Sequence, residues 1–154
     1  MQNKYNLSPL CAAVYCQDLE LVMWLLKSGC NKNGQLENTQ SYYTPLTSIY
    51  LLNSYYYESH GKLDKQQLFT MKQKLFDLLV LQGVDIHEGG LNGKNLLALE
   101  CMKPTILIDP KWIEYLLIKG IDPNKFNFIS SSQMTLQLNK TALIRYKYPF
   151  NKNI

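Results

Sequence analysis

The chain has 154 residues, with 46% hydrophobic content, 18% charged content and a formal net charge of +4. This length suggests a single domain, and the composition excludes the disordered class of chains with low hydrophobicity and high charge. The 16 basic and 12 acidic residues are spread along the sequence, whereas nucleic-acid-binding surfaces normally concentrate basic side chains in a stripe, so nucleic acid is not the expected partner.

The first segment, residues 8–33, predicts two helices joined by a short turn. Ser8 can cap the first helix, and Pro9 suits its first turn, where no backbone N–H is needed. Apolar residues recur at helical spacing in the second helix. We expect them to form its core face: Leu21, Val22, Leu25 and Leu26. Gly29 follows as a stop signal, because glycine adopts the left-handed conformation at low cost.

A second unit starts at Thr44, which opens a Thr-Pro-Leu motif about 36 positions after Ser8. Its second helix ends before Gly83 and can begin near Asp64. The intervening residues 53–67 are interpreted as an inserted loop, which a helical stack can tolerate because each doubling of loop length costs only about 0.6 kcal/mol.

A third unit opens at residues 93–99 and carries another insertion after Cys101. Its second helix is predicted from Asp109 or Pro110 to Lys119, with Asp109 as N-cap and Pro110 at the first helical position. We expect a core face made of these residues: Trp112, Ile113, Leu116 and Leu117.

The pattern weakens after Asn124. Residues 126–138 are compatible with an extended loop or a short hairpin, and residues 139–144 resemble the opening of a fourth unit. That half-unit either caps the stack or belongs to a longer protein, and the sequence leaves both interpretations open.

The three second helices end alike, with a leucine-rich run followed by glycine and a short polar turn. Together with Ser-Pro-Leu at residues 8–10 and Thr-Pro-Leu at residues 44–46, this pattern resembles the ankyrin repeat. Cys11 and Gln17 depart from the histidine and glycine that the family prefers. The resemblance implies an all-α helix-turn-helix solenoid with irregular insertions, as a single domain over residues 1–154. Its units are expected at approximately these positions: 4–36, 40–88, 91–125 and a partial unit at 137–154.

Few residues indicate a catalytic, metal-binding or phosphate-binding site. The four cysteines show no C-x-x-C pairing and no nearby histidine, so we expect reduced thiols and no metal site. His60 lies beside Ser59 and Glu58, but catalytic triads are assembled in space rather than by adjacency. The glycines at 89, 90 and 93 fit a linking turn and lack the pattern of a phosphate loop. We therefore expect no cofactor and no enzymatic activity.

Tyrosine is the more informative residue type, since 11 of the 154 residues are Tyr. Tyrosines bury a large area at little entropic cost and keep a polar group, which favours them in binding hot spots. The resemblance places the turn before each Thr-Pro-Leu motif and the exposed side of each first helix on a concave face. The predicted partner-binding residues are Tyr5, Tyr15, Tyr42, Tyr43, Tyr55, Tyr56, Tyr57 and Lys94. In the alternative interpretation, Tyr50 and other tyrosines pack beneath the long loop.

The resemblance implies a protein–protein interaction module that binds a partner protein through its concave face and inserted loop. Small proteins of this kind, rich in Lys and Asn, resemble those of bacteria and large DNA viruses, where they act as host-directed effectors or as inhibitors of a toxin. The alternative is a targeting fragment of a larger enzyme whose catalytic domain is absent here. No signal peptide or membrane-length apolar segment is visible, so we expect no membrane insertion and a cytoplasmic location in the source or host cell.

Overall fold

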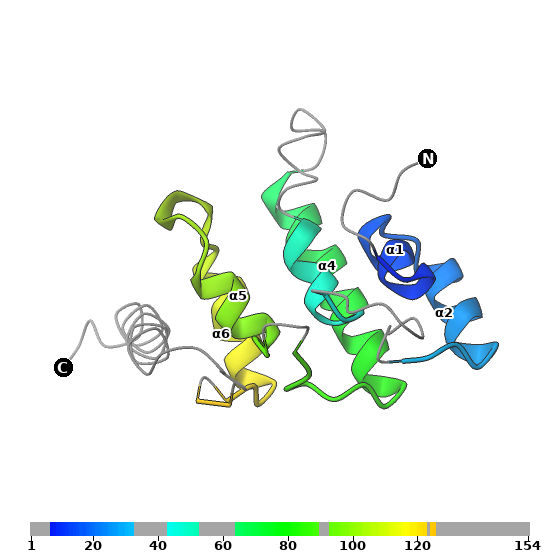
Figure 1. Ribbon diagram of the computed structural model, residues 1–154. Coiled ribbons are helices and arrows are strands. Elements are labelled where there is room, and N and C mark those ends of the chain that lie inside the picture. The colour runs from blue at the N-terminus through cyan, green and yellow to red at the C-terminus, as the bar shows by residue number, and fades with distance from the viewer. Residues whose placement is uncertain (1–6, 33–42, 53–63, 90–92, 123, 126–154) are drawn as a thin grey trace.

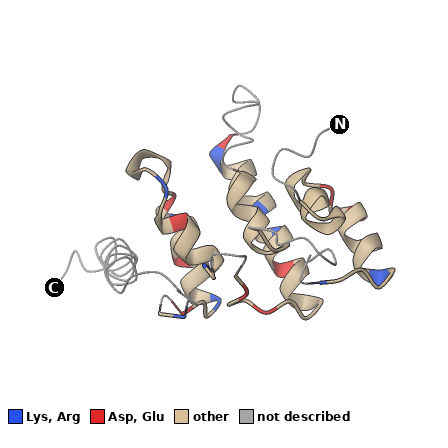
Figure 2. Cartoon of the chain, viewed as in Figure 1, with Lys and Arg blue, Asp and Glu red and all other residues tan. Residues whose placement is uncertain are grey.

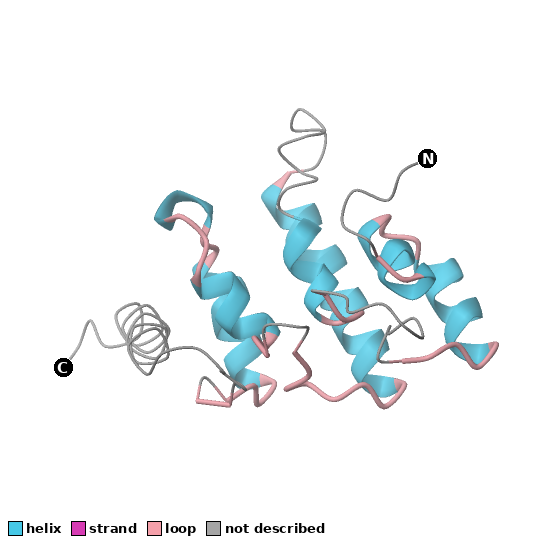
Figure 3. Ribbon diagram, in the orientation of Figure 1, coloured by secondary structure: helices cyan, strands magenta, loops and turns pink. Residues whose placement is uncertain are grey.

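The computed structural model describes residues 7–32, 43–52, 64–89, 93–122 and 124–125 (Figure 1). Within these ranges the chain forms helices and turns and no strand (Figure 3), which confirms the predicted all-α class. No helix in this part of the chain is long and apolar enough to cross a membrane. The elements are α1 (Pro9–Tyr15), α2 (Leu19–Lys27), η1 (Thr47–Leu51), α4 (Lys65–Leu81), α5 (Leu96–Cys101), η2 (Thr105–Leu107) and α6 (Pro110–Ile118).

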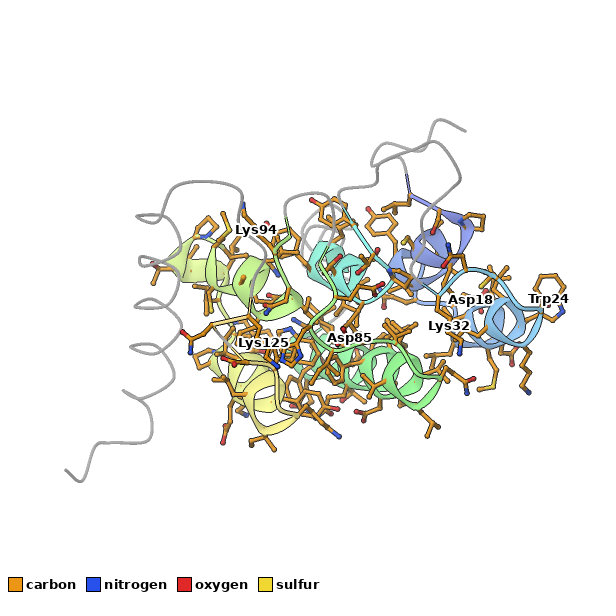
Figure 4. The ribbon with its side chains drawn as sticks, turned by 60° about the horizontal axis from the view of Figure 1, so that its bottom comes forward. Asp18, Trp24, Lys32, Asp85, Lys94 and Lys125 are labelled. Carbon is orange, nitrogen blue, oxygen red and sulfur yellow. The ribbon has the colours of Figure 1, made fainter. Side chains whose placement is uncertain are left out.

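The helices form two rows. In Figure 4, α1, η1 and α5 lie along one side, and α2, α4 and α6 lie along the other. The 3-10 helix η1 contacts both α1 and α5, so it is the central member of the first row. Each helix pair lies beside the next in chain order, as Figure 1 shows. The predicted partial unit at 137–154 and the segment 126–138 lie outside the described residues.

Short polar side chains start the helices. The Ser8 hydroxyl accepts a hydrogen bond from the Cys11 N–H at 3.2 Å, and the Asp109 carboxylate accepts one from the Lys111 N–H at 3.0 Å. In both helices a proline follows the cap, as the sequence predicts. Each cap satisfies a backbone donor that the first turn of a helix leaves unpaired.

Helix α4 begins with a reciprocal capping box. The Gln67 N–H donates to the Asp64 carboxylate at 2.7 Å, and the Asp64 N–H donates to the Gln67 side-chain oxygen at 3.2 Å. This confirms the predicted start near Asp64. The predicted inserted loop at 53–67 is too long, however, because residues 65–67 form the first turn of α4.

The three second helices end in the same kind of turn. Gly29, Gly83 and Gly120 have φ angles of +82°, +90° and +96°, a region that residues with a Cβ rarely adopt. In each turn the N–H after the glycine reaches a carbonyl five residues earlier, at 3.2, 3.1 and 3.2 Å in chain order. The turns are therefore equivalent, and the glycine stops are confirmed.

One apolar core runs through the units, and its largest member is Trp112 of α6. The Trp112 ring meets the rings of Phe69 and Phe76 edge-on, with centroids 6.1 and 6.3 Å apart. Tyr115 stacks on Trp112 at 5.3 Å, and its hydroxyl donates to the carboxylate of Asp77. Helix α6 therefore packs on α4 through an aromatic cluster.

The predicted core face of α2 is wrong at one position. Val22 and Leu26 are buried and Leu25 is partly buried, but Leu21 is 41% exposed. Helix α2 lies at the end of its row, so among the described helices of that row it has a neighbour on one side only (Figure 4). In α6 the predicted face is buried except for Leu117, which is partly buried.

The two tryptophans predict opposite effects on stability. Trp112→Ala should lower the free energy of unfolding by about 3–5 kcal/mol, because it leaves a cavity between α4 and α6. Trp24→Ala in dilute protein should cost about 0.5 kcal/mol, because Trp24 is 63% exposed. Urea unfolding followed by circular dichroism measures both, and equal losses would contradict this packing.

Candidate partner-binding surface

The structure describes Tyr15, Tyr43 and Lys94 among the predicted binding residues, and each is partly buried. The remaining predicted binding residues lie outside the described residues: Tyr5, Tyr42, Tyr55, Tyr56 and Tyr57.

The turn before η1 fixes the position of Tyr43. The Thr44 N–H donates to the Thr47 hydroxyl at 2.7 Å, and the Thr47 N–H donates to the Thr44 hydroxyl at 3.2 Å. The thiol of Cys11 lies 3.7 Å from the carbonyl oxygen of Tyr43 and donates to it. These hydrogen bonds hold the turn in one conformation and connect it to α1. The Thr-Pro-Leu motif at residues 44–46 therefore fixes the position of Tyr43, the residue before it.

Tyr43 and Tyr15 meet at a small apolar cluster between the first two units. Its buried members are Leu7, Cys11 and Leu51, and these partly buried residues pack against it: Ala12, Tyr15, Tyr43 and Tyr50. The rings of Tyr43 and Tyr50 are stacked, with centroids 6.3 Å apart and planes 17° apart. We call Tyr15, Tyr43 and Tyr50 the tyrosine cluster. The structure therefore brings two of the predicted binding residues together.

A buried ion pair links the tyrosine cluster to the third unit. The Lys103 ammonium lies 4.6 Å from the centroid of the Tyr50 ring and 2.7 Å from the Glu100 carboxylate. Both charged side chains are at most 5% exposed. Burial lowers the pKa of Lys103 to about 8, and the opposing effect of Glu100 keeps it from falling further. Sequence reasoning missed this pair, although acid and base at positions i and i+3 were a usable signal.

A second buried lysine lies at the junction of α4 and α6. Lys72 is 1% exposed, and its ammonium lies 4.8 Å from the centroid of the Trp112 ring. Burial lowers the pKa of Lys72, while Glu100 and Asp109 oppose the shift. Sequence reasoning missed Lys72 too, although it lies at helical spacing from Leu68 and Phe76 on the apolar face of α4, which was a usable signal.

Lys94 lies in the turn between the second and third units, on the side of the molecule formed by the first row of helices, α1, η1 and α5 (Figure 4). A Cβ on Gly89 would lie 2.6 Å from the carbonyl carbon of Gly93, so the two arms of this turn are in close contact. Glu88, at the start of the turn, lies close enough to the side chain of Thr44 for Thr44 to lower the pKa of its carboxyl group. Because Thr44 follows Tyr43, the turn that carries Lys94 lies near the turn that carries Tyr43.

Polar turn residues join successive units on the opposite row. The Lys32 ammonium donates to the Gln82 carbonyl at 2.6 Å, and the Asp122 N–H donates to Nε2 of His87 at 3.0 Å. His87 is partly buried, and this hydrogen bond bridges the second and third units. Its acceptor nitrogen is already used by the backbone, which makes it a structural group.

The match to known proteins agrees with this geometry. The model of the ankyrin repeat matches residues 5–35, which contain α1, α2 and the turn at Gly29. The first unit of the chain is thus similar to an ankyrin repeat. A search of curated proteins found no significant match.

Ankyrin repeats are typically non-catalytic interaction modules. Within the described ranges, no cluster of three His, Cys, Asp or Glu side chains could hold a metal ion. Charged side chains are scattered over the helices and turns shown in Figure 2 rather than gathered on one face. Among the predicted binding residues that the structure describes, Tyr15 and Tyr43 are brought together in the tyrosine cluster.

Glu88 predicts a pH-dependent stability. Burial is the largest cause that raises its pKa from 4.5 to about 7, with Asp85 adding to the shift and Thr44 opposing it. Folding therefore favours the protonated form: this stabilisation is fully present below pH 4.5 and is lost as the pH rises through about 7.

Glu88→Gln should remove this dependence and, at pH 8, raise the free energy of unfolding by on the order of 1–2 kcal/mol after allowance for partial solvent access. Urea unfolding between pH 5 and pH 8 measures the effect, with the exposed Glu20→Gln as control. Parallel curves for the parent protein and Glu88→Gln would contradict it.

Proposed function

We propose that this protein binds a partner protein through the tyrosine cluster and the adjoining turn at Lys94. The observation that carries the proposal is the position of Tyr15 and Tyr43, which are partly exposed at the junction of α1 and η1. Ankyrin repeats generally mediate protein binding, which supports this type of partner.

The cluster suits binding because it is held rigidly before any partner arrives. Tyr43 is fixed by the Cys11 thiol, by the stacked Tyr50 ring and by the Thr44 turn. A pre-organised aromatic side chain loses little conformational entropy on association, so more of its buried area contributes to affinity.

Charge favours a partner of opposite sign. The formal net charge of the chain is +4, and Lys94 lies on the same side as the first row of helices. We propose that the partner presents an acidic rim around an apolar patch, because complementary charge raises association rates and fixes orientation. Such a surface would act by binding to the partner and blocking or positioning it. This mode of action fits a host-directed effector, a toxin inhibitor or a targeting segment of a larger enzyme.

Tyr43→Ala should weaken partner binding by about 2 kcal/mol, or roughly 30-fold in Kd, if Tyr43 is a hot spot. The partner is first identified by capture and mass spectrometry, and the affinity is then measured by calorimetry. Ile118→Ala is the control, because Ile118 is 69% exposed and lies in the other row. A loss of only a few tenths of a kcal/mol for Tyr43→Ala would contradict the proposal.

We further propose that the inserted residues 53–63 enlarge the binding surface. They follow directly on η1, which carries Tyr50, and they contain Tyr55, Tyr56 and Tyr57. Replacing them with a short Gly/Ser linker should weaken the same partner by about 10-fold or more while the helix content of the described units is kept. An unchanged affinity in a folded deletion variant would limit the surface to the tyrosine cluster.

A further inference from the structure

The outer face of α2 exposes two large apolar side chains. Leu21 and Trp24, which are three residues apart and therefore lie on the same face of the helix, are 41% and 63% exposed. Figure 4 shows Trp24 at the end of the second row, projecting away from α4. Exposed large apolar side chains that gather on one helix face mark interaction sites more often than isolated ones do.

The equivalent face is covered in the later units. Aligned on the glycine turns, Leu21 corresponds to Leu75 and Trp112, which are both 0% exposed. Trp24 corresponds to Leu78 and Tyr115, which are partly buried. In the third unit this face packs against aromatic rings of α4. In the later units, the equivalent face packs against a neighbouring helix. In α2, no described residue covers this face.

The charges on this face make it complementary to itself. Glu20, Trp24 and Lys27 are spaced by four and three residues, so they form one stripe along α2, and both charged residues are exposed. When two such helices pack antiparallel about a two-fold axis near Trp24, Glu20 of each copy faces Lys27 of the other. The helix dipoles are then also antiparallel, which favours the pairing.

We propose that the outer face of α2 is a homodimer interface, in which α2 packs antiparallel against α2 of a second copy of this chain. The contact is isologous, so it closes after two copies. It covers Leu21 and Trp24 on both copies. The tyrosine cluster, which lies on the first row of helices, takes no part in this contact. The dimer presents two partner-binding surfaces, although the interface itself does not depend on the proposed function.

The full 154-residue chain tests the interface by sedimentation equilibrium over a concentration series. The expected mass rises from 17.9 kDa toward twice that value as concentration increases. Trp24→Ala should raise the dimer Kd by at least about 10-fold. Ile118→Ala should leave the Kd unchanged, although Ile118 is as exposed as Trp24. A chain that stays monomeric at its highest soluble concentration overturns the proposal and leaves the face to a different protein.

Charge reversal tests the antiparallel arrangement. Glu20→Lys alone or Lys27→Glu alone should weaken the dimer by about 5- to 10-fold, because each places like charges opposite one another. The double variant, E20K with K27E, should restore the parental Kd, since the pairs form again with reversed signs. Circular dichroism verifies that every variant is folded. A double variant as weak as the single ones, or single variants with the parental Kd, overturns the arrangement.

Discussion

The structure depends on the packing of the second helix of one unit against the second helix of the unit before it. In this packing the apolar face of α6 is buried against α4. Trp112 shows the constraint most clearly, because it fills the space between α6 and α4 and meets Phe69 and Phe76 edge-on. Short helices of nine residues, such as α6, are not stable alone, so their order comes from this packing. The glycine turns and polar caps fix where each helix ends, which keeps the apolar faces in register.

The same packing connects the core to the candidate binding surface. Lys72 contacts the Trp112 ring, and Glu100 lies close enough to both Lys72 and Lys103 to shift their pKa values. Lys103 in turn lies over the Tyr50 ring, on which Tyr43 is stacked. A series of electrostatic interactions and ring contacts thus runs from the middle of the stack to the surface. This explains why the tyrosine cluster can be rigid although it lies in short turns and a 3-10 helix.

Local features of the fold were predictable and non-local ones were not. Ser8, Asp109 and the three turn glycines act through bonds to residues a few positions away, so their roles could be predicted from the sequence alone. The exposure of Leu21 could not, because periodicity identifies an apolar face without telling whether a neighbour covers it. The Glu100–Lys103 pair was missed although its i and i+3 spacing was a local signal, whereas the burial of the pair depends on the packing of the units. Tyr50 packs in the tyrosine cluster, whereas the long loop of the alternative interpretation lies outside the described residues.

Hydrogen–deuterium exchange of the protein with and without its bound partner tests the central claim most directly. The account predicts that binding slows exchange in the segments around Tyr15, Tyr43 and Lys94, because these segments form the contact surface. Exchange in the last turn of α6, where Ile118 is exposed on the other row, should not change. Protection confined to the second helices, with no change from Tyr43 to Leu51, would contradict the account.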